Sequence, residues 1–132
     1  MIKRYKRPDN KDALSIINAS KKEMEFTLSL DVNEKSGSTI VKNIYECFRM
    51  LGDALLVLKG KESQGHIESI EELLKLNVNT KRPIGVIKNL RILRHNINYY
   101  GYSPKIEEVK DVISIAKDCF VPLFNEIMKI IF

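Results

Sequence analysis

Apolar residues recur every three or four positions through most of the chain, which is the spacing of amphipathic helices. The clearest run lies between Ile40 and Leu58, and Gly60 follows as the expected stop. Further helices are expected over about residues 10–29, 65–76, 80–100 and 104–130. No segment shows the period of two that marks a half-buried strand. The pattern predicts an all-α fold, an antiparallel bundle of four to five helices with the Ile40–Leu58 helix at its centre.

Several residues have the properties required at helix ends. Asp9 suits an N-cap before the first helix, and Gly101 suits a left-handed C-cap after the fourth. Pro83 suits the first turn of the fourth helix, while Ser103 and Pro104 suit the N-cap and first turn of the last. The fourth helix is expected to bury five residues: Ile84, Ile87, Leu90, Ile97 and Tyr100.

The last helix carries a second apolar stripe besides the one expected to face the core. Its members are Val112, Ile115, Cys119 and Leu123. A helix that is apolar on two sides is either buried all round or faces another subunit. In a domain this small we favour a homodimer interface; the alternative is that this helix is the central one of the bundle.

Length and composition indicate one globular unit. The chain has 132 residues, of which 44% are apolar and 30% charged, and we divide it into a basic tail over residues 1–9 and a single helical domain over 10–132. Its longest uninterrupted apolar run covers only residues 54–58, far short of the roughly 20 residues that cross a membrane. No apolar stretch follows the charged start as it does in a signal peptide. We therefore expect a cytoplasmic protein that does not bind the membrane.

Residue types used in metal and cofactor sites are scarce. Cys47 and Cys119 lie far apart within apolar helical patterns, so we expect two buried thiols. The only histidines are His66 and His95, and no zinc-ligand spacing or glycine-rich phosphate loop occurs. The sequence predicts neither a metal site nor a cofactor.

The net charge of +5 is unevenly distributed. Residues 1–7 carry four basic side chains and no acid, residues 81–102 carry five and no acid, and the remainder carries 13 basic and 17 acidic residues. Local basicity favours a surface for an anionic partner, and a solvated helix face is the alternative. In the tail, Tyr5 lies among basic residues, a combination that suits contact of the cations with phosphates and stacking of the ring on a base. The alternative is a solvated chain terminus.

A helix over residues 81–100 aligns polar groups of particular chemistry. Lys88, Arg91, His95 and either Asn98 or Tyr99 form one stripe, in which Arg91 and His95 are one turn apart, about 6 Å between Cβ atoms. An imidazole can take or give a proton near neutral pH, and a guanidinium can hold a phosphate by two parallel hydrogen bonds. Together they provide the minimum for metal-free RNA cleavage. The alternative is a chance pairing on a surface helix.

This stretch, LRILRHNINYYG over residues 90–101, resembles the HEPN (higher eukaryotes and prokaryotes nucleotide-binding) superfamily, particularly its small prokaryotic members. The resemblance covers about residues 10–130 in helix order, and its specific part is residues 88–102. It implies a homodimer and a metal-independent endoribonuclease of toxin–antitoxin or defence type, with Arg91 and His95 forming a composite site across the dimer. The other function that it implies is a catalytically silent module that binds nucleotide or a minimal nucleotidyltransferase.

The resemblance also assigns residues to roles. Three residues separate Arg91 from His95, whereas the family usually has about four to six; Lys88 has six residues between it and His95 but is a lysine. The expected substrate-binding residues are Lys88, Arg94, Asn96, Asn98 and Tyr99. In relatives a tyrosine just after the histidine can be modified by the nucleotidyltransferase, and the candidates here are Tyr99, which is nearest, Tyr100 and Tyr102.

Overall fold

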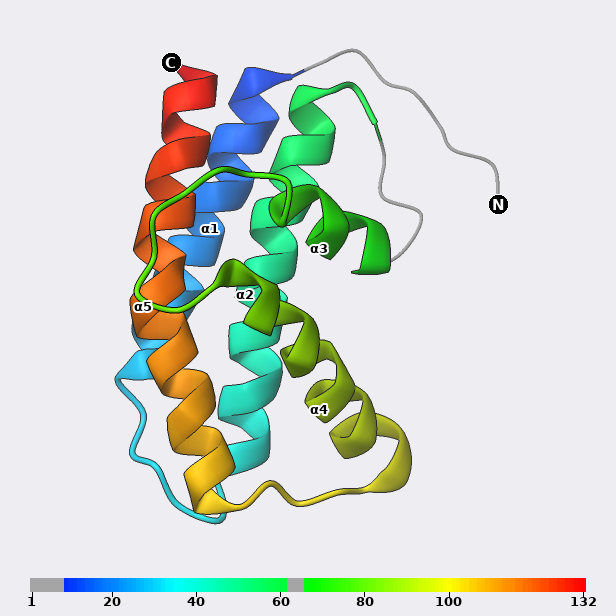
Figure 1. Ribbon diagram of the computed structural model, residues 1–132, viewed down its shortest axis with the longest axis vertical. Helices are drawn as coiled ribbons and strands as arrows, with labels where there is room; N and C mark the ends of the chain where they lie inside the picture. Colours follow the sequence, from blue (N-terminus) through cyan, green and yellow to red (C-terminus); the bar gives the residue numbers. More distant parts are fainter. Residues whose placement is uncertain (1–8, 62–65) are drawn as a thin grey trace.

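The computed structural model describes residues 9–61 and 66–132, and this part of the chain is all-helical (Figure 1). Its elements are α1 (Asn10–Leu28), α2 (Gly37–Leu58), α3 (His66–Leu73), the 3₁₀ turn η1 (Ile84–Val86), α4 (Ile87–Tyr100) and α5 (Ile106–Ile131). The predicted all-α class is confirmed. The predicted basic tail lies outside the described residues except for Asp9. Among the described helices, none is long and apolar enough to cross a membrane.

α2 occupies the centre of the molecule, as its apolar pattern predicts. It contacts each of the other four α-helices, and 12 of its 22 residues are buried. Tyr45, Phe48 and Leu51 are among the largest fully buried side chains. α1, α2 and α5 lie side by side along the long axis; α1 runs opposite to the other two, whereas α2 and α5 run in the same direction (Figure 1). The predicted antiparallel packing therefore applies to α1, while α3 and α4 return the chain between α2 and α5.

Two predicted helix ends form as expected. Asp9 precedes α1, and its carboxylate accepts a hydrogen bond of 3.0 Å from the backbone N–H of Asp12. Gly101 ends α4 with a φ of 64°, in the left-handed region that glycine enters without steric cost. Both ends are encoded by a single residue and its immediate neighbours, which is why the sequence predicts them.

Two helices begin later than predicted. Pro83 is extended (ψ 133°) and precedes η1, so α4 itself begins at Ile87. The segment before Pro83 is held against α5, because the Arg82 guanidinium donates a 2.7 Å hydrogen bond to Asp111, and the chain turns into a helix only after this contact. Ser103 and Pro104 also lie outside a helix.

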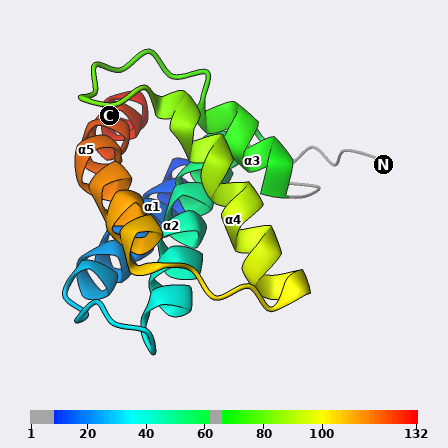
Figure 2. The ribbon, with the colours of Figure 1, turned by 60° about the horizontal axis from the view of Figure 1, so that its bottom comes forward.

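At the start of α5, Lys105 takes the N-cap position that was predicted for Ser103. The backbone N–H of Lys105 donates a 2.9 Å hydrogen bond to the Glu108 carboxylate. Ser103 and Pro104 instead belong to the connection that carries the chain from the end of α4 to α5 (Figure 2). A helix begins where its first amides find acceptors, and here Glu108 provides one.

The second apolar stripe of α5 is buried within this chain. None of its four members, Val112, Ile115, Cys119 and Leu123, is more than 3% exposed. α5 packs on α1 and α2, and the segment before α4 covers part of its remaining side, where the carbonyl oxygen of Arg82 lies 3.6 Å from the Cys119 sulfur. The prediction that this stripe forms a homodimer interface is therefore wrong, because an internal segment occupies the place assigned to a second copy.

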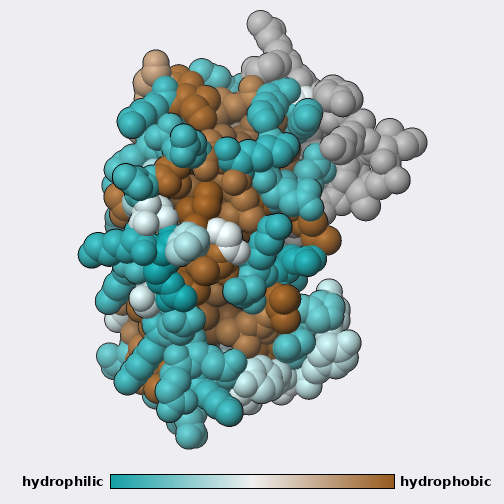
Figure 3. Space-filling model, in the orientation of Figure 1, coloured by the Kyte–Doolittle hydropathy of each residue, from teal (hydrophilic) through white to brown (hydrophobic). Residues whose placement is uncertain are grey.

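The predicted burial along α4 is correct for Ile87, Leu90 and Ile97 and wrong at its ends. Ile84 is only half-buried, and Tyr100 is 75% exposed. Tyr100 is the last residue of α4, where the helix has diverged from the neighbouring helices (Figure 2). Apolar side chains also reach the surface between α4 and α5 on the face shown in Figure 3.

α3 crosses α2 at Gly52, and this crossing requires a residue without a side chain. A Cβ atom added at Gly52 would lie 2.0 Å from the backbone carbonyl oxygen of Ser69. Near this crossing the buried Glu72 of α3 accepts hydrogen bonds from Lys59 and Lys75. Burial opposes ionisation of Glu72, but these lysines outweigh it and hold the pKa of the carboxyl below its usual range.

We predict that Gly52→Ala destabilises the protein by about 2 kcal/mol or more, because α3 must move off α2. A loss of stability would be informative, because alanine in a helix interior is otherwise favoured over glycine by about 1 kcal/mol. Gly85→Ala is the matched control, because a Cβ there meets nothing within 4 Å. Urea unfolding of both variants measures the difference, and equal stability of Gly52→Ala and the parent would contradict the close approach.

Candidate nucleic-acid interface

The candidate interface is the face of α4 that points away from α2. Ile87, Leu90 and Ile97 are buried on the inner side. Figures 1 and 2 place α4 across α2 from α1, with its C-terminal half clear of the other helices. Its exposed residues are Lys88, Asn89, Arg91, Ile92, His95, Asn98, Tyr99 and Tyr100. The polar stripe predicted from the sequence is therefore accessible to a partner.

Arg91 and His95 lie together, as their spacing predicts. Both are exposed, and with Ile92 they line one open hollow of about 270 Å³. The His95 ring also contacts two aromatic rings, with centroid distances of 4.6 Å to Tyr99 and 5.7 Å to Tyr100. A guanidinium and an imidazole that share one hollow can contact the same small anionic group.

Arg94 lies apart from this hollow. Its side chain is half-buried on the inner side of α4, and its guanidinium carbon is 5.5 Å from the centroid of the Tyr45 ring of α2. Burial raises the pKa of the Tyr45 hydroxyl, while Arg94, Arg91 and Arg49 act to lower it. Arg94 thus helps to hold α4 on α2 through a cation–π contact, a role that the sequence analysis did not assign to it.

The other predicted substrate-binding residues divide between the outer face and its flanks. Lys88 and Tyr99 are exposed on the same outer face as His95. Asn98 is exposed toward one flank, and Asn96 is half-buried about 100° around the helix from His95. The backbone carbonyl of Asn96 accepts a 3.1 Å hydrogen bond from the Tyr102 amide, which closes the end of α4.

Two exposed residues of α4 were not predicted at this surface: Ile92 was not among the predicted site residues, and Tyr100 was predicted to be buried. Ile92 is 59% exposed and lines the hollow together with Arg91 and His95. Ile92 lies outside the apolar stripe of its helix, and this position could have indicated from the sequence that its side chain is exposed. For Tyr100 the position beside a helix-ending glycine was the signal, because side chains at a helix end have fewer neighbours to pack against.

Acidic residues near α4 are already paired with a cation of their own helix. The Arg49 guanidinium donates hydrogen bonds to Glu46 and Asp53, and these contacts raise the pKa of Arg49. Asp53 also accepts a hydrogen bond from the Ser69 hydroxyl. These contacts hold both carboxylates within α2 and α3.

Neither cysteine provides a nucleophile. Burial, together with Glu23 and Glu46, raises the pKa of the Cys47 thiol to about 12, and burial also raises the pKa of Cys119. Both are buried free thiols, as predicted. In residues 9–61 and 66–132 there is no group of three or more His, Cys, Asp or Glu side chains placed to hold a metal ion.

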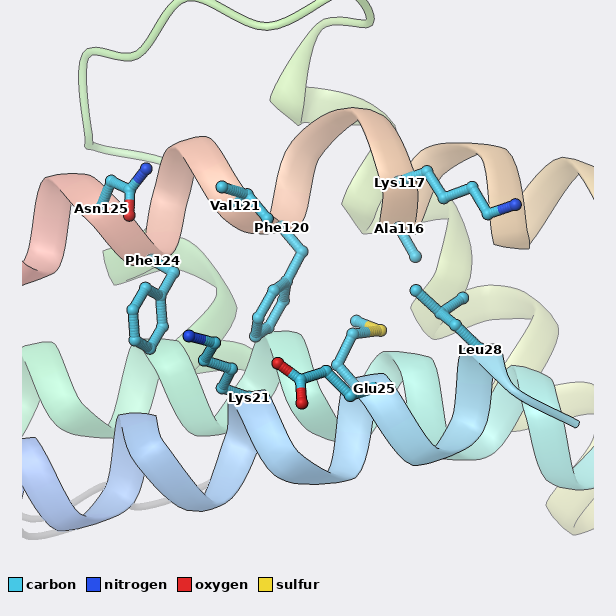
Figure 4. Close-up of a pocket in the computed structure, with 10 residues that line it drawn as sticks. Lys21, Glu25, Leu28, Ala116, Lys117, Phe120, Val121, Phe124 and Asn125 are labelled. Carbon is cyan, nitrogen blue, oxygen red and sulfur yellow. The ribbon is translucent and has the colours of Figure 1, made fainter.

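A second hollow lies between α1 and α5, on the side away from α4 (Figure 4). It measures about 320 Å³ and has an apolar lining: Met24, Leu28, Ala116, Phe120, Val121 and Phe124. Lys21 and Glu25 of α1 reach over it from one side, and the Lys21 ammonium is 5.4 Å from the centroid of the Phe124 ring. The apolar part of the lining suits an apolar surface of a partner.

No protein-family model, curated protein or solved structure matches the chain. The resemblance to the HEPN superfamily therefore stays a prediction from the sequence.

We predict that both thiols of the folded protein react slowly with an aromatic disulfide reagent at pH 8. With a pKa of about 12, Cys47 is ionised in only about one molecule in ten thousand at that pH, and its sulfur is buried. Labelling should be at least about a hundredfold faster in urea, where two thiols should react. Absorbance of the released thiolate measures both rates, and rapid labelling of one thiol in the folded protein would contradict the burial.

Proposed function

We propose that this protein is a HEPN-like helical domain that acts on RNA through the outer face of α4, as a metal-independent endoribonuclease of toxin–antitoxin or defence type. The observation that supports this most is the pairing of Arg91 with His95, both exposed and lining one hollow. Lys88 and Arg91 are exposed on this face and α4 carries no acidic residue, which favours an anionic substrate.

The proposed chemistry is attack of a ribose 2′-hydroxyl on the adjacent phosphate. An imidazole takes the hydroxyl proton, the guanidinium of Arg91 stabilises the negative charge that develops on phosphorus-bound oxygens, and an acid protonates the departing 5′-oxygen. The products are a 2′,3′-cyclic phosphate and a free 5′-hydroxyl. His95 supplies one of the two proton-transfer groups that this reaction uses.

A homodimer would supply the other. In a two-fold arrangement with α4 facing α4, each copy contributes one Arg91 and one His95 to a composite site. Ile92 supports such a contact, because it lines the same hollow as these two residues and is 59% exposed. Burial of this side chain against a second copy would favour the pairing by about 1 to 2 kcal/mol per copy.

We predict that His95→Ala lowers the rate of RNA cleavage in the presence of EDTA by about 10²- to 10⁴-fold, because it removes proton transfer. Arg91→Lys should also slow cleavage, since a lysine keeps the charge but loses the two parallel hydrogen bonds. Gel analysis of an end-labelled RNA, with identification of the cyclic phosphate, measures the rate and the chemistry.

Asn89→Ala is the matched control for this prediction, because Asn89 is an exposed neighbour on the same helix outside the hollow. It should cleave at the parental rate. The proposed mechanism is wrong if His95→Ala cleaves as fast as the parent protein.

The second candidate function is a catalytically silent module that binds a partner, such as a minimal nucleotidyltransferase. The observation that favours it is the apolar hollow between α1 and α5, which is remote from α4 and suits a partner's apolar surface. A binding module needs no second proton-transfer group, so it is compatible with a single histidine per chain on α4.

For this candidate, Val121→Glu should abolish co-purification with a co-expressed nucleotidyltransferase from the same operon. Val121 lines the hollow and is 59% exposed, so a carboxylate there blocks an apolar contact while the core stays intact. Phe26→Glu is the matched control, because Phe26 is 57% exposed on α1 but outside the hollow. Retained binding by Val121→Glu would exclude this hollow as the docking site.

A further inference from the structure

Three aromatic rings gather at the C-terminal end of α4. The His95 ring lies 4.6 Å from Tyr99 and 5.7 Å from Tyr100 between centroids. Tyr99 and Tyr100 are 67% and 75% exposed, so large faces of both rings contact solvent. Large exposed aromatic side chains that cluster on one helix end mark a surface for binding rather than for internal packing.

The other described tyrosines have structural roles that these two lack. Tyr45 is fully buried under Arg94. Tyr102 donates a hydrogen bond from its hydroxyl to the Glu108 carboxylate, which ties it to the start of α5. Among the described residues, no hydrogen bond holds the side chain of Tyr99 or Tyr100, so the contact with His95 is what orients them.

The two ends of α4 suit different contacts, because the cations lie near its start and the exposed tyrosine rings near its end. Lys88 and Arg91 stand in its N-terminal half, and the helix dipole also favours anions near that end. The tyrosines stand in the last turn, where the dipole disfavours an anion but leaves an uncharged π-face unaffected. About 12 Å of helix separates Arg91 from Tyr99, a length that a short run of nucleotides can span.

We propose that Tyr99 and Tyr100, which pack against the ring of His95, form a stacking subsite for unpaired bases of an RNA strand whose phosphates lie on Arg91 and Lys88. This inference rests on the proposed RNA-directed function and defines the form of the substrate. The faces of bases in a duplex are covered by their neighbours, so the subsite selects a single strand. The strand lies along α4. Nucleotides near the Ile87 end contact the helix through their phosphates, and nucleotides near the Gly101 end contact it through their bases.

Binding of three oligonucleotides tests this subsite: a single strand, the same strand with abasic sites, and its duplex. All carry 2′-O-methyl groups, which block cleavage, and fluorescence anisotropy measures affinity at several salt concentrations. The Tyr99→Leu/Tyr100→Leu variant should bind the base-bearing single strand about 10- to 100-fold more weakly than the parent, the range for loss of one stacked base. Its affinity for the abasic strand should equal the parent's, because the phosphate contacts remain.

Three controls define the cause of any loss. Tyr99→Phe/Tyr100→Phe keeps both rings and should retain affinity, while Phe26→Leu removes an exposed ring on α1 and should change nothing. Arg91→Ala should weaken binding of all strands and reduce the salt dependence, since it removes a phosphate contact. Light scattering on each variant reports whether its oligomeric state has changed.

The stacking subsite is overturned if the double leucine variant binds the base-bearing strand as the parent does. It is also overturned if that variant loses affinity for base-bearing and abasic strands equally, or loses affinity together with its oligomeric state, because the tyrosines would then support the fold or a subunit contact. Failure of the proposed function is a different result: neither binding of any strand nor cleavage that depends on Arg91 and His95.

Discussion

The burial of α2 is the constraint from which the positions of the other helices follow. Different faces of α2 carry different side chains, and each face fits a different neighbour. Phe48 packs edge-on against Phe120 of α5, with ring centroids 5.9 Å apart. Gly52, which has no side chain, allows the backbone of α3 to lie close to α2. Tyr45 lies beneath Arg94 of α4. A helix that is apolar on several sides cannot lie at the surface, so α1, α3, α4 and α5 must cover it.

The way in which α4 covers α2 creates the candidate site. Ile87, Leu90 and Ile97 face inward, and Arg94 adds a cation–π contact on the same side. Since a helix repeats every 3.6 residues, this inward set turns Arg91 and His95 toward solvent. Lys88 and Arg91 are exposed on this outer side, and α4 itself carries no acidic residue, so their positive charge is accessible to a partner.

Local signals in the sequence predicted the parts of the fold that depend on local interactions. The periodicity of α2 and the caps at Asp9 and Gly101 are examples, because each is determined within a turn of helix. The start of α4 and the burial of the second stripe of α5 could not be predicted in this way, since both depend on contacts between segments far apart in the chain, such as those of Arg82 with Asp111 and Cys119 of α5. The same holds for Arg94, whose inward position depends on Tyr45, a residue of another helix.

Under the proposed function, cleavage of RNA requires a second copy that docks on the outer face of α4, whereas binding of RNA does not. The chain offers one histidine on α4, whereas metal-free cleavage of RNA uses both a base and an acid. Contact at Ile92 would bring two His95 side chains to one phosphate and complete that pair. A partner protein docked at the hollow between α1 and α5 would instead leave the outer face of α4 uncovered, because α4 lies across α2 from that hollow (Figure 2). This face would then hold a single imidazole, which is compatible with binding of RNA but does not supply both the base and the acid that this mechanism uses.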